Sequence, residues 1–348
     1  MRYDILIVGG SVAGLCAGIE LARAGIKTAI FERKPAVGFP VQCAEFVPYA
    51  FGLATRSFMP FVAREIRGLK TIVDDHSGKT HTLYSDQRGF VLNRGMWERH
   101  LAAQAVLAGA QLFVGEAVVE IEFAKDRVIA KTPRRTAEAQ IIIGADGPIS
   151  ITSIFAGVET QKVMPAIQYI LPLKLELSEN IVIFSPEIRG GYAWIFPKGE
   201  VANVGIGAWG VSRKKLDEIV RRFAEILAPS PIETVGGLIP VYGMRKKVAG
   251  ERYILVGDAA GLTDPITGAG IASAWESATI AAKTAADFLA GKINSLTEYE
   301  RRIRFLRRAV ERSLRRRIEM ERRWDDEQNF FETIRESWIP SRESGSAG

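Results

Sequence analysis

Short apolar runs of strand length recur along the chain, and the first two are separated by a segment with helical spacing. Tyr3–Val8 is a continuous apolar run, Leu15–Ala24 places apolar residues at helical intervals, and Lys27–Phe31 is apolar again. Continuous apolar runs are typical of strands that helices cover on both faces of a parallel sheet. The pattern therefore predicts a β–α–β unit. Similar short runs at Ile141–Ile143 and Tyr253–Val256 predict further buried strands.

The middle of the chain has a different pattern, in which apolar and polar residues alternate. Ile66–Tyr84 is predicted to form a hairpin, and four more strands are predicted at Ala166–Leu171, Asn180–Phe184, Tyr192–Phe196 and Val201–Gly207. Alternation with a period of two is the signature of an antiparallel sheet with one covered face. Ser212–Leu227 has helical spacing and is predicted to be an amphipathic helix.

A glycine-rich turn follows the first predicted strand. The segment Gly9-Gly10-Ser11-Val12-Ala13-Gly14 lies between that strand and the first helix, which is the context that a dinucleotide-binding fingerprint requires. Ser11 stands where the second glycine of the fingerprint is usual. The second strand ends at Glu32, followed by Arg33, at the spacing expected for a carboxylate that binds ribose hydroxyls.

A second glycine-rich turn lies about 250 residues later along the chain. Gly257 and Asp258 follow a short apolar run, and Pro265, Gly268, Ala269 and Gly270 precede a helix of small residues that begins near Ile271. A carboxylate and a glycine loop at a helix N-terminus suit a ribose and phosphates. Two such turns, far apart along the chain, resemble the arrangement in FAD-containing enzymes with a split Rossmann domain, which favours FAD over NAD as the dinucleotide.

Two further segments resemble motifs of the flavin hydroxylase and reductase superfamily. Ile141–Gly147 ends in Gly144-Ala145-Asp146-Gly147 and resembles its GADG motif, and Asn93–Leu101 resembles the helix whose arginine, here Arg94, lies near the flavin. The resemblance implies FAD as the cofactor. It also implies that Pro265–Gly270 lies against the flavin ring, with the helix from Ile271 directed at it. The arginines that usually follow the GADG motif are absent from Pro148–Ser153, which argues against docking of NADPH in the usual way.

The predicted sheet adds a more selective resemblance. Tyr192, Trp194 and Phe196 alternate and so share one sheet face, and the segment Tyr192–Pro197 with Gly205-Ile206-Gly207 resembles the Y-x-W-x-F-P…G-x-G motif of the geranylgeranyl reductase family. That family also has a cysteine-containing loop after the second strand, here Gly38–Pro48 with Cys43, Ala44 and Glu45. The three aromatic side chains are either core residues or the wall of an apolar substrate pocket.

The resemblance implies an α/β fold with a discontinuous Rossmann-type (GR2-like) FAD-binding domain and an antiparallel substrate sheet. We assign residues 1–60, 90–160 and 250–290 to the FAD-binding domain, and residues 61–89 and 161–249 to the substrate-binding sheet. Residues 291–340 are predicted to be an arginine-rich helical segment, and residues 341–348 a disordered tail.

Reduction of an isolated alkene requires a proton as the hydride arrives, because no carbonyl stabilises the charge. The resemblance makes the Cys43 thiol the candidate acid, with Glu45 beside it as a second catalytic candidate. It also implies that Cys43 and Ala44 lie near the cofactor. The expected function is FAD-dependent reduction of C=C bonds in an isoprenoid chain. The alternative is a monooxygenase that hydroxylates an aromatic or peptidyl substrate through a flavin hydroperoxide, and a third, non-enzymatic possibility is an FAD-binding partner protein. The electron donor is open among ferredoxin, a deazaflavin and NAD(P)H.

Composition and charge limit the partners, metal sites and cellular compartments that are expected for this protein. The net charge is +6, and the segment Tyr299–Trp324 is rich in arginine, with Ile303, Leu306, Val310, Leu314 and Ile318 spaced for one apolar face. This helix is expected either to be a solvated helix or to contact an anionic membrane surface or an acidic partner, with no nucleic acid as a partner. The start at Met1 leads directly into a predicted strand, so no signal peptide is expected. Two cysteines and three scattered histidines predict no disulfide and no metal site, and cytoplasm is the expected compartment.

Overall fold

The structure is a computed structural model that describes residues 1–338 and 342–343. The chain folds into two compact units, each made of three segments. The first unit contains residues 1–39, 95–163 and 240–312, and the second contains residues 40–94, 164–239 and 313–348. Both are discontinuous in sequence, so the α/β class with a discontinuous Rossmann-type part is confirmed.

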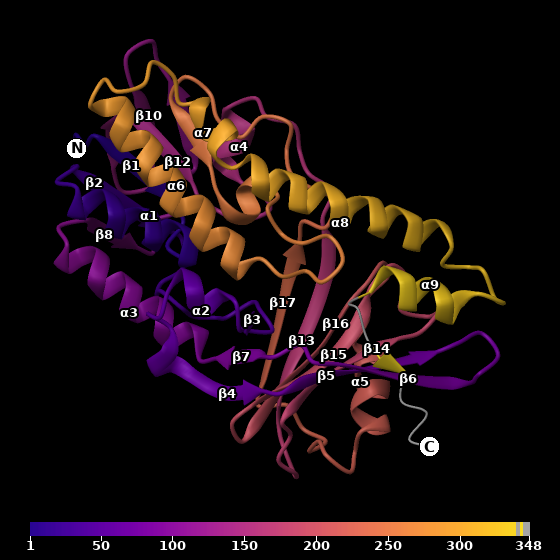
Figure 1. Cartoon of the computed structure of the whole chain (residues 1–348). Helices are drawn as coiled ribbons and strands as arrows, with labels where there is room; N and C mark the ends of the chain where they lie inside the picture. Colours follow the sequence, from indigo (N-terminus) through magenta and orange to yellow (C-terminus); the bar gives the residue numbers. More distant parts are fainter. Residues whose placement is uncertain (339–341, 344–348) are drawn as a thin grey trace. The chain divides into compact units, whose positions relative to one another are not determined.

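A five-stranded parallel sheet forms the centre of the first unit (Figure 1). Its order is β18 (Tyr253–Leu255), β12 (Ile141–Gly144), β1 (Ile5–Val8), β2 (Thr28–Glu32) and β8 (Gln111–Val114). The strands β1, β2 and β12 are buried at every position, which explains their unbroken apolar sequence. A small antiparallel sheet adds β9 (Glu120–Phe123), β10 (Val128–Lys131) and β11 (Thr136–Ala139).

Helices accompany the parallel sheet. They are α1 (Val12–Arg23), α3 (Arg94–Leu107), α4 (Ile151–Phe155), the 3₁₀ turn η2 (Gly257–Ala260), α6 (Ile271–Leu289) and α7 (Glu298–Arg302). Figure 1 shows α1 and α6 side by side, and these two helices pack against each other. Cys16 lies on α1 in this packing, where burial raises the pKa of its thiol to about 12. The helix α1 begins at Val12, three residues earlier than the spacing of apolar residues predicts.

An eight-stranded mixed sheet forms the second unit. Its order is β17 (Glu233–Ile239), β13 (Met164–Pro172), β16 (Val201–Gly207), β15 (Tyr192–Lys198), β14 (Glu179–Phe184), β5 (Gly68–Asp74), β6 (Thr80–Ser85) and β19 (Arg342–Glu343). A three-stranded sheet consists of β3 (Phe46–Pro48), β7 (Gly89–Leu92) and β4 (Val62–Ile66), and the short helices are α2 (Phe51–Ala54), η1 (Met59–Phe61), α5 (Arg213–Arg222) and α9 (Phe330–Ser337). The hairpin and the four alternating strands predicted from the sequence are all present.

Strand alternation separates the two faces of the large sheet. Tyr169, Ile195 and Val204 point into a core cluster that also includes Leu216 and Val220 of α5. Their neighbours along the strands therefore point to the opposite face. That opposite face carries the predicted site residues Tyr192, Trp194 and Phe196.

The units group several stretches of the chain differently from the predicted domains; residues 90–94, for example, belong to the second unit. Residues 40–60 group with the sheet, because β3 pairs with β7 through Phe46 and Val91. Residues 240–249 group with the parallel-sheet unit, because the buried Arg245 donates to the backbone oxygen of Ala259 at 2.8 Å. Residues 291–340 form no separate segment, since α7 packs on α6 and α9 packs on β5. The predicted tail lies outside the described residues except for β19.

The arginine-rich segment is the helix α8 (Arg304–Arg322), and its buried face differs from the predicted one. Ile303, Leu306 and Val310 are buried as expected, but Ile318 is 53% exposed. The buried positions continue instead through Ser313, Arg317 and Met320, which keeps the alternating spacing of three and four residues. The helix α5 also ends at Arg222 rather than Leu227.

Candidate active site

The first glycine turn brings the start of α1 close to the ends of β1 and β12. Gly9 has φ of +106°, and a Cβ atom there would lie 2.2 Å from the carbonyl oxygen of Ala145. A Cβ on Gly14 would lie 1.9 Å from the carbonyl oxygen of Gly9. Only glycine fits at these two positions. Val12, Ala13 and Gly14 form the first turn of α1, and no side chain caps this helix end.

Two carboxylates flank this turn. The Glu32 side chain is 7% exposed and accepts hydrogen bonds from the backbone nitrogens of Gly10 at 2.6 Å and Lys34 at 2.7 Å. The Ser11 hydroxyl donates to the buried Glu98 of α3 at 2.6 Å. The serine that replaces the usual glycine is thus tied to the motif helix that starts at Arg94. Arg33, which follows Glu32, is exposed.

Asp146 of the GADG segment has its carboxylate occupied within the protein. It accepts hydrogen bonds from the Ser150 hydroxyl at 2.6 Å and from the backbone nitrogen and hydroxyl of Thr152 at 2.9 and 3.1 Å. Burial raises the pKa of Asp146, and these hydrogen bonds act in the opposite direction. Asp146 therefore fixes the start of α4, and Gly147 follows it with φ of +79°.

The second glycine turn folds into a closed loop. The Asp258 carboxylate accepts from the Thr263 hydroxyl at 2.7 Å, and a Cβ on Gly270 would lie 3.1 Å from that carboxylate. Asp264 accepts from the backbone nitrogens of Ile266 and Thr267 at 3.0 and 2.8 Å. These bonds hold the segment that contains Pro265, Gly268 and Ala269. The loop leads to Gly270, the N-cap residue of α6, and no side chain caps this helix end either.

The parts of the first unit fit a dinucleotide. Uncapped helix ends leave backbone N–H groups for an anionic ligand, and α1 and α6, which both have such ends, pack together. Bare glycine backbone lines the turn at Gly9 and Gly10, next to the Glu32 carboxylate. The residues Gly9–Gly14 and Glu32 are the candidates for holding the adenosine and pyrophosphate. The candidates from the second turn are Gly257, Asp258 and the start of α6 at Ile271.

The cysteine loop belongs to the second unit, and Glu45 is the residue that shapes it. Glu45 has φ of +67° and is the single non-glycine residue with positive φ among those described. Its backbone nitrogen donates to the Cys43 sulfur at 3.2 Å, and its carbonyl oxygen accepts from Leu92 at 3.0 Å. A left-handed glutamate costs about 1–2 kcal/mol, so the surrounding contacts must hold it.

The Glu45 carboxylate is 1% exposed as a side chain and is surrounded by donors. Lys198 donates to it at 2.6 Å, Asn203 at 2.9 Å, and the backbone nitrogen of Arg94 at 2.9 Å. All three partners donate, so Glu45 acts here as a hydrogen-bond acceptor. The structure thus places the predicted site residues Cys43, Ala44, Glu45 and the backbone of Arg94 together.

The sheet holds the rest of the loop through two amide side chains. Gln168 of β13 donates to the carbonyl oxygen of Cys43 at 3.1 Å, and Asn203 of β16 donates to that of Ala44 at 3.1 Å. The indole nitrogen of Trp194 donates to Gln168 at 3.0 Å. A Cβ on Gly205 would lie 2.2 Å from the Trp194 ring, so this glycine of the G-x-G pair makes room for the indole.

The three aromatic residues of β15 do share the face of the sheet that carries Gln168 and Asn203. Trp194 is 7% exposed, while Tyr192 and Phe196 are half-buried. The ring of Phe196 contacts that of Phe46, next to Glu45, with centroids 5.9 Å apart. Tyr192 packs edge-on against Trp338 after α9, at 5.1 Å. An apolar surface therefore adjoins the cysteine loop within the same unit.

Sequence reasoning missed Lys198, Gln168 and Asn203. The two amides stand within otherwise apolar strands at positions that face away from the core cluster. A polar residue within a strongly apolar strand indicates a buried side chain that needs a hydrogen-bond partner, and this was the signal available in the sequence. Lys198 is the last residue of β15 and gave no signal of its own.

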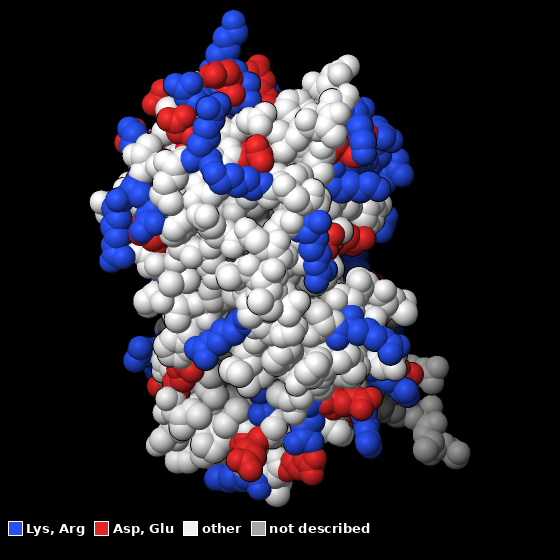
Figure 2. Space-filling model, turned by 90° about the vertical axis from the view of Figure 1, so that its left-hand side faces the viewer, with Lys and Arg blue, Asp and Glu red and all other residues white. Residues whose placement is uncertain are grey.

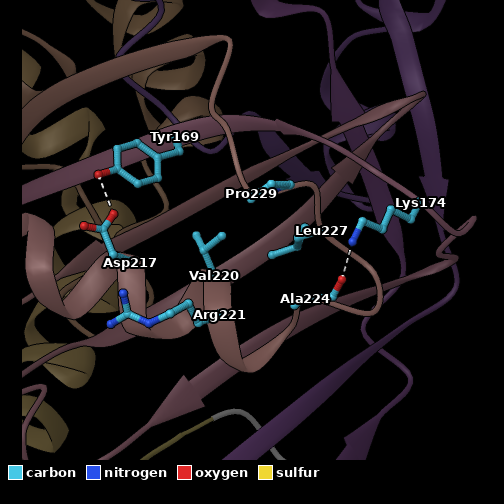
Figure 3. Close-up of a pocket in the computed structure, with 8 residues that line it drawn as sticks. All are labelled: Tyr169, Lys174, Asp217, Val220, Arg221, Ala224, Leu227 and Pro229. Atoms are coloured by element: carbon cyan, nitrogen blue, oxygen red, sulfur yellow. Dashed lines mark hydrogen bonds between the residues drawn. The ribbon is translucent and has the colours of Figure 1, made fainter.

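A pocket of about 460 Å³ lies on the other face of the large sheet (Figure 3). Its lining residues are Tyr169, Lys174, Asp217, Val220, Arg221, Ala224, Leu227 and Pro229. The Tyr169 hydroxyl donates to Asp217 at 2.9 Å, as Figure 3 shows. None of the predicted site residues lines this pocket, so it lends no support to their assignment.

Membrane spans and metal clusters are both absent from the described residues. Among residues 1–338 and 342–343, none of the helices combines the length and the apolar character needed to span a bilayer. The same part of the chain contains no group of three His, Cys, Asp or Glu residues placed to hold a metal ion. Lys and Arg are interspersed with Asp and Glu on the face drawn in Figure 2.

Two family models match successive parts of the chain. The FAD dependent oxidoreductase model matches residues 4–161, which contain the first glycine turn and the GADG segment. The geranylgeranyl reductase catalytic domain model matches residues 164–239, which contain β13, β15 and β16. The fold and the first model define the protein as an FAD-dependent oxidoreductase.

Curated relatives narrow this class. The chain is 32% identical to the digeranylgeranylglycerophospholipid reductase of Methanocaldococcus jannaschii, over 86% of this chain and 82% of that protein. It is 31% identical to digeranylgeranylglycerophospholipid reductase 1 of Methanopyrus kandleri, over 97% of this chain and 90% of that protein. The chain therefore belongs to the geranylgeranyl reductase family, and the resemblance to this family that was noted in the sequence is confirmed.

Solved structures agree with this placement. A geranylgeranyl bacteriochlorophyll reductase-like protein from Thermoplasma acidophilum superposes with a TM-score of 0.81 at 26% identity, covering 97% of this chain and 96% of that one. The flavin-dependent halogenase CmlS superposes with a TM-score of 0.73 at 18% identity, covering all of this chain and 68% of that one. This second likeness shows the shared fold alone, so it gives no support to oxygenation.

Proposed function

We propose that this protein reduces carbon–carbon double bonds in geranylgeranyl-type chains of a glycerophospholipid, with FAD as the redox cofactor. The observation that carries the proposal is the 32% identity, over 86% of the chain, to a reductase named for that lipid. The cysteine loop and the aromatic strand, which lie together in the second unit, support it. The monooxygenase alternative has no comparable observation in its favour.

FAD supplies the hydride when it is bound and reduced. Its phosphates and ribose would be held by the candidate residues of the first unit, which are Gly9–Gly14, Glu32, Gly257, Asp258 and Ile271. The uncapped N-terminus of α6 carries partial positive charge and favours an anionic group beside it. We assign Pro265, Gly268, Ala269 and Gly270 to contact with the flavin ring.

Cys43 is the residue that we assign as proton donor. Its sulfur accepts a hydrogen bond from the backbone nitrogen of Glu45, so the thiol proton remains available for another acceptor. An isolated alkene gains a hydride at one carbon and a proton at the other, and a thiol is largely protonated at neutral pH. The aromatic surface of Tyr192, Trp194 and Phe196 would bind the apolar chain and exclude water.

Ferredoxin, a deazaflavin and NAD(P)H each carry electrons that would reduce a bound flavin. Pro148–Ser153 has no arginine, and its Ser150 bonds to Asp146 within the protein. This favours ferredoxin or a deazaflavin over a tightly bound nicotinamide.

We also propose that the protein works in the cytoplasm, at the surface of an anionic membrane. Both cysteines are free thiols, as expected in a reducing compartment. Arg304, Arg308, Arg312 and Arg315 are exposed on α8 and, among the described residues, none of them forms an ion pair or hydrogen bond. At 100° per residue they lie on the side of the helix opposite Ile303, Leu306 and Val310. A one-sided row of free arginines suits anionic lipid headgroups.

Anaerobic turnover with each donor in turn tests the main proposal. The expected product has gained two hydrogens for each reduced double bond, as read by mass spectrometry. Cys43→Ala and Cys43→Ser should keep FAD and lose most of the reduction, whereas Cys16→Ser should stay active. Full activity in both Cys43 variants would remove Cys43 from the chemistry. An oxygenated product in air, without alkene reduction, would instead establish the monooxygenase alternative.

Flotation with anionic vesicles tests the membrane contact separately. The wild-type protein should float with phosphatidylglycerol vesicles at low salt, and binding should fall as salt is raised. Arg308→Glu combined with Arg312→Glu should abolish flotation, while Lys214→Glu on α5 should not. Equal flotation of both variants, or none by the wild-type protein, would exclude α8 as the contact.

A further inference from the structure

We propose that Glu45 is a positioning residue rather than an acid, that Lys198 and Asn203 hold the Cys43 loop through it, and that Gln168 holds the same loop directly. These four residues form the Glu45 network. The proposal rests on the proposed function for its meaning, since Cys43 is the proton donor assigned there. The Glu45 network determines where that thiol lies.

The conformation of Glu45 is the first observation. Its φ of +67° is unfavourable for any residue with a side chain, and it lies in the short connection between Cys43 and β3. A glycine at this position would relieve the strain. The glutamate side chain must therefore contribute enough contacts to offset the strain of its own backbone.

The contacts of the carboxylate are the second observation. One oxygen accepts from Lys198 at 2.6 Å and Asn203 at 2.9 Å, and the other accepts from the backbone nitrogen of Arg94 at 2.9 Å. The Lys198 side chain is 16% exposed and that of Glu45 is 1% exposed, so their ion pair is shielded from water. Charge-assisted hydrogen bonds in such surroundings are stronger and more directional than exposed ones.

The link to the thiol is the third observation. The same residue that forms the ion pair donates its backbone nitrogen to the Cys43 sulfur at 3.2 Å. Gln168 and Asn203 hold the carbonyl oxygens of Cys43 and Ala44 at 3.1 Å each. The carbonyl oxygens of Cys43 and Ala44 are thus bound to strands of the sheet, and the backbone nitrogen of Glu45 is bound to the Cys43 sulfur. The loop has one geometry as long as the network is complete.

A carboxylate surrounded by three donors has no proton to give in this arrangement. The hydrogen bond from Glu45 to the Cys43 sulfur comes from its backbone nitrogen. The network therefore acts on the reaction through Cys43. Loss of a member should change the reactivity and position of the thiol rather than remove a reacting group.

Alkylation of Cys43 tests this without any lipid substrate. Cys16 is buried with a raised pKa, so a small alkylating reagent labels Cys43 in the native holoenzyme. Lys198→Met and Glu45→Gln should release the loop and raise the labelling rate about threefold or more, with a shifted pH profile of that rate. Lys198→Arg should restore most of the wild-type behaviour, and Lys214→Met, an exposed lysine of α5, should match the wild-type protein.

Steady-state kinetics of alkene reduction provide a second measurement on the same variants. Lys198→Met should lower kcat at least tenfold with KM and FAD content close to wild-type values, because the lipid-binding surface is intact. In the double variant Glu45→Gln with Lys198→Met, the losses should not add, since both changes break the same ion pair. Wild-type labelling rates and pH profiles in both single variants would overturn the proposal. Altered labelling in an enzyme that reduces no alkene supports the positioning role and rejects the proposed function instead.

Discussion

The two units of this protein build their candidate sites from different materials. The first unit uses backbone: glycines at Gly9 and Gly14 that leave no room for a Cβ, and the uncapped ends of α1 and α6. The second unit uses side chains from separate strands, such as Gln168 and Asn203, to hold the cysteine loop. A backbone site binds the groups that every dinucleotide shares, whereas a side-chain site holds one particular reactive group.

This difference predicts how each site fails. Adding atoms should destroy the backbone site, because there is no space for them. Removing atoms should damage the side-chain site, because its geometry depends on hydrogen bonds that water or a smaller residue does not reproduce. Substitutions in each unit, ordered from the largest expected effect to the smallest, can break or sharpen that contrast.

Gly14→Val should have the largest effect. Its Cβ would lie 1.9 Å from the carbonyl oxygen of Gly9, and backbone cannot move aside as a flexible side chain does. We expect loss of most bound FAD and destabilisation of about 3 kcal/mol or more. Flavin absorbance of the purified protein and urea unfolding measure the two effects.

Gly52→Ala is the matched control for this substitution. Gly52 is a helical glycine of α2, and no atom lies within 4 Å of a Cβ placed there. Stability and FAD content should both stay close to wild type. A Gly14→Val protein that retains FAD would show that the turn adapts, and the backbone site would then be less rigid than its geometry implies.

Most of the first unit could be predicted from the sequence, and its backbone construction explains why. A glycine turn between a buried strand and a helix is a local pattern, so Gly9–Gly14 and Gly257–Gly270 were visible without knowing the fold. The exact partners were not visible. Asp146, for example, stays a predicted cofactor residue, and the hydrogen bonds of its carboxylate to Ser150 and Thr152 at the start of α4 were not visible in the sequence.

The second unit was predicted less completely, because its contacts join residues far apart in the sequence. Cys43 and Glu45 were found by family resemblance, but Lys198 lies 153 positions from Glu45 and Gln168 lies 125 positions from Cys43. Periodicity gives the face of a strand and not its partner on another segment. It also favoured Ile318 for the buried face of α8, where the structure places Arg317.

Arg317→Met should have the second-largest effect. Arg317 is 1% exposed and donates to the backbone oxygen of Gly190 at 2.8 Å and to Glu321 at 2.8 Å. Methionine fills similar volume but leaves the buried carbonyl oxygen without this donor, for a cost of about 2–3 kcal/mol. Thermal and urea unfolding should show it.

Arg304→Met on the same helix provides the comparison. Arg304 is exposed, so its replacement should change stability by less than about 0.5 kcal/mol. Equal effects of the two substitutions would mean that the burial of Arg317 contributes nothing specific. Because FAD is expected to bind the first unit, Arg317→Met should retain the cofactor, unlike Gly14→Val.

The two cysteines sharpen the contrast through pH. Burial raises the pKa of Cys16 from an ordinary 9.0 to about 12, so the folded protein keeps the proton longer than the unfolded chain does. The stabilisation from the neutral thiol is complete below pH 9.0 and is lost as pH rises toward about 12. Stability should fall by about 1.4 kcal/mol per pH unit in this window.

Urea unfolding of the wild type and of Cys16→Ala at about pH 8 and about pH 10.5 measures this loss. The wild type should lose about 2 kcal/mol more than the variant between the two conditions. Cys43→Ala should show the wild-type slope, because this substitution leaves Cys16 in place. Parallel slopes in all three proteins would show that Cys16 is not buried as a neutral thiol.

Trp194→Phe should have the smallest effect, and it separates the shape of the side-chain site from its hydrogen bonds. Phenylalanine keeps an aromatic ring over Gly205 but removes the N–H that binds Gln168 at 3.0 Å. The buried amide oxygen then lacks its donor, for about 1 kcal/mol. Because Gln168 holds the Cys43 carbonyl oxygen, labelling of Cys43 should rise, though less than in Lys198→Met. Trp209→Phe, whose indole binds Glu321 at 3.3 Å, removes an N–H elsewhere in the same unit and should leave labelling unchanged. If the two tryptophan variants label alike, Trp194 serves the site only through its surface, and the cysteine loop depends on Glu45 and its ion pair alone.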